Sequence, residues 1–223
     1  MVDRYWRGSA QDEVMQDEHG FIWRAMLDMV DADLSGSKVL DAGCNRGGFL
    51  RLLSDEASIG EGFGYDPAPG AIEDARRLAG ARPLTFETSE SVPQGWSGFD
   101  VAFSHEVLYL LHDLPSYATA VYATLVPGAS YFATIGIHAD SALMTTWHGD
   151  NAIALDLPGP YRLDEVAEVF NASGFDVAVG RLPFRFVPVD AHRGDHTDSR
   201  LSSWLDYYYR DKVMFRFTRP QGK

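Results

Sequence analysis

The segment from Lys38 to Leu50 constrains the fold of this chain more than any other. It begins with a short apolar strand at Val39 and Leu40, continues through the acidic Asp41 into a glycine-rich turn, and ends in an amphipathic helix. Glycine is needed in such a turn because a side chain would block close approach of a ligand or the positive φ angles of the turn. This order of elements predicts a ligand-binding corner of an α/β domain.

Strands and helices alternate along the rest of the chain, which predicts a doubly wound α/β fold with a mostly parallel seven-stranded sheet. The remaining strands are expected at residues 62–65, 84–86, 99–103, 130–135, 175–179 and 212–218. Further helices are expected at residues 9–34 and 71–78, between the cap Asp113 and the stop at Pro127, and between Leu163 and Gly174. Residues 137–160 and 183–203 break this rhythm and are expected to be irregular.

Polar residues follow four of these strands at the point where each strand ends. The first strand is followed by Asp41–Gly47, the second by Asp66, the third by Thr88, and the fourth by Ser104 and His105. Ligands of doubly wound sheets bind beyond the carboxyl ends of the strands, so these residues are expected to line one crevice.

The charge balance narrows the classes of partner. The chain has 32 acidic and 19 basic residues and a net charge of −13, which opposes binding to nucleic acid or to an anionic membrane. Its one cysteine, Cys44, cannot form a disulfide within the chain, which fits a reducing compartment. We find neither an apolar signal core at the N-terminus nor an apolar run of about 18 residues, and we expect a cytoplasmic protein.

In sequence order these elements resemble class I S-adenosylmethionine-dependent methyltransferases. The resemblance spans about residues 35 to 182 and implies a Rossmann-like fold that binds S-adenosylmethionine and releases S-adenosylhomocysteine. It rests on the following segments: Val39–Gly47, Gly64–Asp66, Phe99–Leu108, Leu125–Gly128 and Ala172–Phe175. Each segment is common by itself, whereas the ordered set is specific.

The glycine loop departs from the family pattern acidic-x-Gly-x-Gly-x-Gly at Asn45, which replaces the middle glycine. Asn tolerates left-handed backbone angles, so the turn can keep its shape. An NAD(P)-dependent oxidoreductase is an alternative, but its G-x-G-x-x-G pattern would need glycine at this same position. Asp41 would also repel a pyrophosphate, whereas it suits the cationic amino-acid end of S-adenosylmethionine.

The resemblance implies which residues hold the cofactor. Asp41 would orient the methionine amino group, Asp66 would bind the ribose, and Pro67 would pack near the adenine. Thr88 stands where the family often has an acidic residue that holds the adenine amino group. The further expected contacts are Ser89, Ser104 and a backbone cradle of Gly43, Cys44, Asn45 and Gly47.

The acceptor side is less constrained. His105 stands where the family often places a residue that faces the acceptor, so it is the candidate general base, with a structural histidine as the alternative. Within a single domain of residues 1–223, residues 1–34 are expected to form a helical N-terminal lid and residues 137–160 an acceptor-side insert. The candidate acceptor-binding side chains are Tyr5, Trp6, Tyr109, His138, Trp147 and His148.

The expected activity is in-line transfer of the methyl group to a small molecule by a monomer or homodimer. A non-catalytic sensor or partner subunit that binds S-adenosylmethionine is a second interpretation, because the fold carries no fixed catalytic residue. No metal site is expected, since His192 and His196 lack a third well-spaced ligand cluster. The acceptor and the atom that is methylated stay open.

Overall fold

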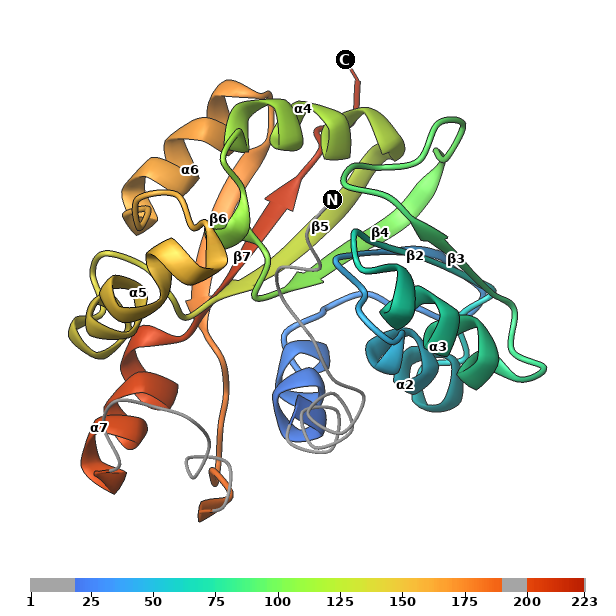
Figure 1. Cartoon of the computed structure of the whole chain (residues 1–223). Helices are drawn as coiled ribbons and strands as arrows, with labels where there is room; N and C mark the ends of the chain where they lie inside the picture. Colours follow the sequence, from blue (N-terminus) through green and yellow to red (C-terminus); the bar gives the residue numbers. More distant parts are fainter. Residues whose placement is uncertain (1–18, 190–199, 223) are drawn as a thin grey trace.

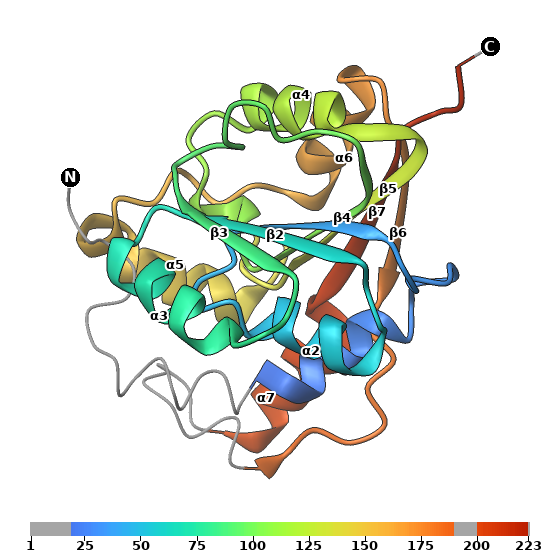
Figure 2. The same cartoon turned by 90° about the vertical axis from the view of Figure 1, so that its right-hand side faces the viewer.

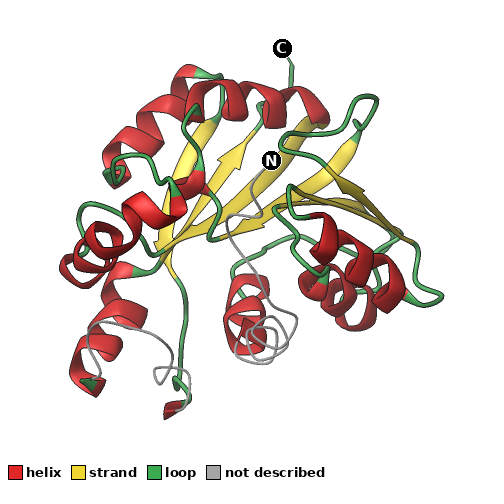
Figure 3. Cartoon of the chain, in the orientation of Figure 1, coloured by secondary structure: helices red, strands yellow, loops and turns green. Residues whose placement is uncertain are grey.

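The computed structural model describes residues 19–189 and 200–222. The strands are β1 Lys38–Ala42, β2 Glu61–Asp66, β3 Leu84–Thr88, β4 Phe99–His105, β5 Leu125–Ile135, β6 Asp176–Arg181 and β7 Val213–Thr218. They form one seven-stranded sheet in the order β3-β2-β1-β4-β5-β7-β6 (Figures 1 and 3). β1 to β5 pair in parallel, and β7 runs antiparallel to both β5 and β6. The predicted doubly wound, mostly parallel sheet is therefore confirmed.

Helices connect the strands and cover both faces of the sheet. Residues 19–27 form the first described helix. It is followed by α2 Gly48–Glu56, α3 Pro69–Ala79, the 3-10 turn η1 Leu108–Leu110, α4 Leu114–Thr124, α5 Ala142–Leu155, α6 Leu163–Ala172, α7 Leu201–Asp206 and the π-helical turn η3 Tyr207–Asp211. In Figure 2, α4 and α6 lie together above the sheet, whereas α2, α3 and the helix 19–27 lie below it.

Local sequence signals account for several of these helices. α2 turns a stripe of Phe49, Leu50 and Leu53 into the core, as its apolar spacing predicts. α4 begins where the Asp113 side chain accepts a hydrogen bond from the backbone N–H of Ser116 at 3.0 Å, with proline in the first turn. Both helices are therefore anchored next to the carboxyl ends of β1 and β4.

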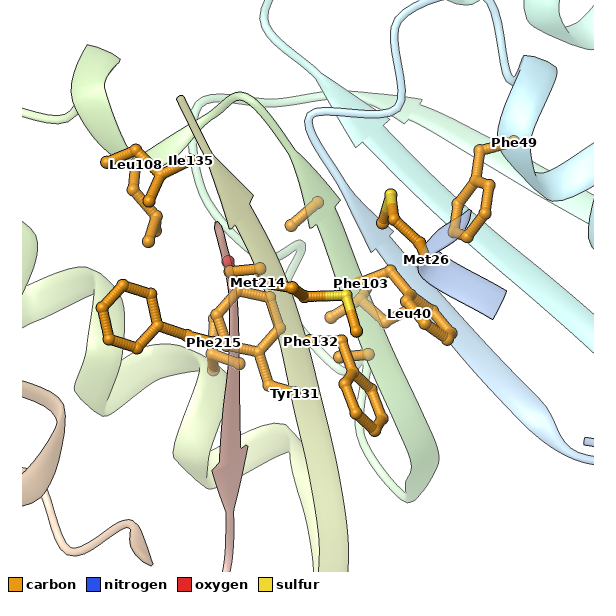
Figure 4. Close-up of a cluster of buried hydrophobic side chains, with 14 of the residues drawn as sticks. Met26, Leu40, Phe49, Phe103, Leu108, Tyr131, Phe132, Ile135, Met214 and Phe215 are labelled. Carbon is orange, nitrogen blue, oxygen red and sulfur yellow. The ribbon is translucent and has the colours of Figure 1, made fainter. Parts of the chain in front are cut away.

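The core is rich in aromatic rings. The rings of Phe170 on α6 and Phe217 on β7 stack with their centroids 3.8 Å apart. Figure 4 shows Met26 of the helix 19–27 within the same buried cluster as Leu40 and Phe103. The helix 19–27 is consequently part of the core.

This helix belongs to the segment expected to act as a lid. Ile22 and Met26 are buried, and the Trp23 ring packs on Phe49 with 6.0 Å between centroids, so residues 19–27 are docked on the sheet. Residues 1–18, including Tyr5 and Trp6, lie outside the described residues. Closure of the segment 1–34 over the site stays a prediction.

The segment 137–160 was expected to be irregular, and this expectation is wrong. Most of it is helix α5, which begins where the Ser141 hydroxyl accepts a hydrogen bond from the N–H of Met144 at 3.3 Å. Its apolar residues are spread around the helix and make no single stripe, so the periodicity gave no signal. β5 is also longer than expected: it begins at Leu125, and its pairing with β4 is irregular between Phe99 and Val101.

Candidate active site

The carboxyl ends of β1 to β4 meet at the point where the strand order reverses, between β1 and β4. The register aligns Asp66 at the end of β2 with Thr88 at the end of β3, and Asp41 of β1 with Phe103 of β4. Four of the predicted positions, Asp41, Asp66, Thr88 and His105, thus lie along one edge of the sheet. This is where ligands of open α/β sheets bind.

The glycine loop after β1 has the predicted left-handed conformation. φ is 76° at Gly43, 47° at Asn45 and 69° at Gly47. A Cβ atom on Gly43 would lie 2.5 Å from a methyl of Val107, and one on Gly47 would lie 2.5 Å from the Phe86 ring. Glycine is therefore required at both ends of the loop, whereas Asn45 adopts the strained angle itself.

The backbone N–H groups of this loop donate to other atoms of the protein. Gly43 and Cys44 donate to the carbonyl of Tyr65 at 2.9 and 3.0 Å, Asn45 donates to Asp66 Oδ2 at 3.0 Å, and Gly47 donates to the carbonyl of Cys44 at 2.8 Å. A pyrophosphate would need such groups as donors. The four residues of the predicted cradle therefore allow a ligand to approach the backbone closely. Their N–H groups, however, are already bonded within the protein.

Asp66 links the glycine loop to the start of α3. Its Oδ2 accepts from Asn45 and its Oδ1 accepts from the N–H of Ala68 at 2.9 Å, and the side chain is buried. An ionised carboxylate has about four lone-pair positions, so its oxygens can accept from more than one donor, as a ribose contact requires.

Asp41 is a buried carboxylic acid with a strongly raised pKa. Its side chain is 3% exposed, and it accepts no hydrogen bond from the residues that the structure describes. Burial, together with the nearby Asp66 carboxylate, raises its pKa to about 8. A cationic group placed beside Asp41 would offset this cost and favour the ionised form. The buried Oδ1 of Asn45 also lacks a partner in the described part of the chain. Both acceptors fit the ammonium end of S-adenosylmethionine.

Cys44 shows no sign of nucleophilic chemistry. Its thiol is buried, and burial together with the charges of Asp41 and Asp66 raises its pKa well above the usual value. A Cβ atom on Gly64 would lie 2.7 Å from its sulfur, so the thiol fills the space between β1 and β2. The side chain acts in packing.

The residues expected near the adenine differ in their availability. Pro67 and Thr88 are exposed at the strand ends, as a ligand contact requires. Ser89 donates its N–H to the Asp66 carbonyl at 3.0 Å and its hydroxyl to the carbonyl of Ser91 at 2.6 Å. This hydroxyl builds the turn after β3.

Ser104 is fully buried and belongs to a chain of hydroxyl groups. Its Oγ lies 2.5 Å from the Tyr131 hydroxyl, which lies 2.9 Å from the Tyr117 hydroxyl. These bonds connect β4, β5 and α4. The side chain expected to line the methionine thus supports the strand end from inside the core.

His105 ends β4 and packs against the helix 19–27. Its Nδ1 accepts a hydrogen bond from the indole N–H of Trp23 at 3.2 Å, and its ring meets that of His19 edge-on at 4.6 Å. Burial lowers the pKa of His105 well below its usual value, with contributions from His19 and Lys212. Burial, aided by Lys212, also lowers the pKa of His19 to about 3. Both rings are neutral at neutral pH.

A buried ion pair flanks these two histidines. Lys212 Nζ lies 2.5 Å from Glu106 Oε1 and 3.3 Å from the Tyr207 hydroxyl, and the N–H of Gly136 donates to Glu106 Oε2 at 3.2 Å. The sequence reasoning missed His19, Trp23, Glu106 and Lys212 as site residues. The backbone of this turn is strained, since Glu106 is not a glycine and has a φ of 57°.

The predicted acceptor-binding residues fall into two groups. The rings of Tyr109 and Trp147 meet edge-on at 6.0 Å, between η1 and α5. His138 Nε2 lies 2.8 Å from the carbonyl of Asp211, and His148 Nε2 lies 2.7 Å from the carbonyl of Pro158. These two buried imidazoles hold loops in place. Tyr109 is buried in the core and Trp147 is half-buried, so contact of this pair with an acceptor stays a prediction.

Residues 19–189 and 200–222 contain no cluster of three His, Cys, Asp or Glu side chains that could hold a metal ion. His192 and His196 lie outside these ranges. Within the same ranges, no helix combines the length and the apolar character that crossing a membrane requires.

A family model described as a methyltransferase domain matches residues 15–178. The chain belongs to this methyltransferase family. S-adenosylmethionine is the methyl donor of such enzymes, which decides against the NAD(P)-dependent oxidoreductase.

Among solved structures, a chain from the complex between the Haloferax volcanii Trm112 methyltransferase activator and a methyltransferase has a TM-score of 0.81 at 21% identity, over 96% of this chain and 95% of that chain. An S-adenosylmethionine-dependent methyltransferase of Mesorhizobium loti has a TM-score of 0.68 at 19% identity, over 92% and 100%. These likenesses confirm the methyltransferase fold.

Two curated relatives act on different acceptors. The chain is 29% identical over 113 residues to malonyl-[acyl-carrier protein] O-methyltransferase of Serratia marcescens, covering 50% of this chain and 44% of that protein. It is 26% identical over 197 residues to tRNA U34 carboxymethyltransferase of Idiomarina loihiensis, covering 82% and 56%. The chain thus spans about half the length of the curated relatives that it matches.

Proposed function

We propose that this methyltransferase domain transfers the methyl group of S-adenosylmethionine to a small-molecule acceptor by in-line displacement. The observation that carries the proposal is Asp41, a buried carboxylate beside a glycine loop whose N–H groups are already bonded. Such a site offers acceptors to a cationic ligand and few donors to a phosphate. When bound, S-adenosylmethionine supplies an electrophilic methyl group on a sulfonium.

The residues of the chain would act mainly by positioning. Asp41 holds the amino group and Asp66 the ribose, while the strained glycine loop lets the ligand approach the backbone closely. Holding the nucleophile, the methyl carbon and the sulfur in line accounts for much of the rate of such reactions. The Trp23 ring packs against Phe49 of α2, which fixes the helix 19–27 beside the start of α2.

A small molecule is favoured as the acceptor by charge. One relative is named for tRNA, but a net charge of −13 opposes a polyanion, and the described part of the site contains a buried Lys212 that is already paired with Glu106. The aromatic pair Tyr109 and Trp147 beside α5 supports an acceptor of modest size with an apolar part.

The test is binding followed by turnover. S-adenosylhomocysteine at about 100 times its Kd should raise the unfolding free energy by roughly 2.7 kcal/mol, seen as a higher Tm, whereas NAD(P) should not. A panel of acids, amines, alcohols, thiols and bulk tRNA would then be screened for release of S-adenosylhomocysteine. Binding without turnover on any acceptor would favour the non-catalytic sensor, and turnover on tRNA alone would contradict the small-molecule acceptor.

A further inference from the structure

The two ring nitrogens of His105 have opposite environments at the point where the sheet order reverses. Nδ1 lies 3.2 Å from Nε1 of Trp23. Nε2 is buried and has no hydrogen-bond partner among residues 19–189 and 200–222. The imidazole is thus held by one nitrogen, whereas the other is buried without a partner.

The partner on Nδ1 fixes the tautomer. An indole N–H can only donate, so Nδ1 of His105 must carry a lone pair. In the neutral ring the proton is then on Nε2, which becomes an N–H donor without an acceptor. A buried donor that lacks an acceptor is costly, so a ligand that accepts from it gains affinity, by about 10-fold to 100-fold.

The surroundings also disfavour the imidazolium form. A second proton on Nδ1 would face the indole N–H of Trp23, donor against donor. The His19 ring meets the His105 ring edge-on at 4.6 Å, and the ammonium of Lys212, which is paired with Glu106, acts on it electrostatically. A cation at His105 would be repelled by Lys212. Nε2 therefore has no lone pair that could accept a proton. The ring also carries no net charge.

We propose that His105 is a fixed, neutral hydrogen-bond donor that selects an acceptor with an ionised carboxylate, instead of a general base. This rests on the proposed methyl transfer. An alcohol would require a base to remove its proton. An amine that accepted a hydrogen bond from Nε2–H would use the lone pair that must attack the methyl carbon. A carboxylate has two oxygens, so one can accept from His105 while the other attacks.

The chemistry then balances without a proton transfer. The second carboxylate oxygen forms a bond to the methyl carbon as the carbon–sulfur bond breaks and its electron pair goes to sulfur. An anion and a sulfonium become a neutral ester and a neutral thioether. This step uses the Nε2–H donor of His105 and needs no base.

The tautomer can be measured directly by long-range ¹H–¹⁵N correlation spectra of the full chain, labelled at histidine and bound to S-adenosylhomocysteine. We expect a protonated Nε2 and an unprotonated Nδ1 at His105, unchanged between about pH 6 and pH 9. His105→Gln assigns the signals. A proton on Nδ1, or titration near the usual histidine pKa of about 6.5, would overturn the proposal. Failure of S-adenosylhomocysteine to bind would instead count against the proposed function.

The substrate class is tested with acetate and its neutral isostere acetamide, using the indole N–H signal of Trp23 as reporter. Acetate should cause a saturable shift and acetamide should not. His105→Gln keeps an N–H donor and should bind acetate within about tenfold of the parent chain, whereas His105→Leu should lose saturable binding. Equal binding of acetate and acetamide, or unchanged acetate binding by the leucine variant, would refute carboxylate selection.

Discussion

Lys212, which precedes β7, is buried and forms an ion pair with the half-buried Glu106, which follows β4; Nζ and Oε1 are 2.5 Å apart. β5 lies between these two strands in the sheet, so the pair bridges across it. It is completed by the N–H of Gly136 and the hydroxyl of Tyr207. The pair fixes the turn that follows His105.

Removing one partner of this pair should destabilise the fold strongly. Lys212→Met leaves the Glu106 carboxylate buried without its cation, at a cost of about 3–5 kcal/mol. The double variant Lys212→Met with Glu106→Gln should recover most of this loss, because no charge is left unpaired. Urea midpoints of the two single variants and the double variant measure the coupling. A single variant as stable as the double would show that the pair is not desolvated.

Asp41→Asn should stabilise the ligand-free chain at high pH. The pKa of Asp41 is raised to about 8 by burial, so its ionisation opposes folding. Its stabilising contribution is complete below the unfolded pKa of about 3.9 and is lost progressively as the pH rises toward the folded value. The gap in Tm between the variant and the parent chain should therefore widen between about pH 4 and pH 8 and then level off. A constant gap would contradict this assignment.

The same substitution should weaken cofactor binding. The neutral amide of Asp41→Asn cannot pair with an ammonium group as a carboxylate does, and a hydrogen bond to a charged group contributes about 1.5–3 kcal/mol. Affinity for S-adenosylhomocysteine, measured by calorimetry, should fall by about 10-fold to 100-fold. Asp100→Asn is the matched control: this exposed residue lies near the start of β4, at the end opposite the carboxyl ends, and accepts from the Lys38 N–H, so cofactor binding should be normal.

Gly64→Ala should disturb the glycine loop by crowding Cys44. The added Cβ would lie 2.7 Å from the Cys44 sulfur and 2.9 Å from the Phe86 ring, so the loop or the ring must shift. We expect a loss of about 1–3 kcal/mol and weaker cofactor binding. Gly70→Ala meets nothing within 4 Å and lies in the first turn of α3, so it should be neutral or slightly stabilising. Urea midpoints separate the two outcomes.

His19 should make the fold sensitive to acid. Its pKa is lowered to about 3 in the folded chain, so its contribution to stability is present above the unfolded pKa of about 6.5 and is lost as the pH falls toward 3. His19→Phe should flatten the decline of the urea midpoint below about pH 6.5. An equally steep decline in the His19→Phe variant would contradict this role of His19.

The succession of strands and helices along the chain and the shape of the glycine loop could be predicted because their signals are local. Positive φ at Gly43, Asn45 and Gly47 follows from which residues tolerate that region of backbone space. The cap at Asp113 likewise needs only its own turn. Burial of Asp41 follows from its place at the end of a central strand.

The acceptor side could not be predicted in the same way. The contact of Trp23 with His105 joins residues 82 positions apart, and that of Lys212 with Glu106 joins residues 106 positions apart. Such pairs arise from tertiary packing, and a single sequence contains no spacing that reports them. The histidines His138 and His148 were chosen by residue type, whereas the structure turns their Nε2 atoms to backbone carbonyls.

The hydrogen bonds from Gly43, Cys44 and Asn45 to Tyr65 and Asp66 have a consequence for the energetics of recognition. The loop reaches its final shape during folding of the chain, and no ligand is needed to satisfy its backbone. The entropy of ordering the loop is then lost before the ligand arrives and does not reduce the affinity. The ligand should consequently enter a preformed, rigid site, with fast association limited by access to the edge of the sheet.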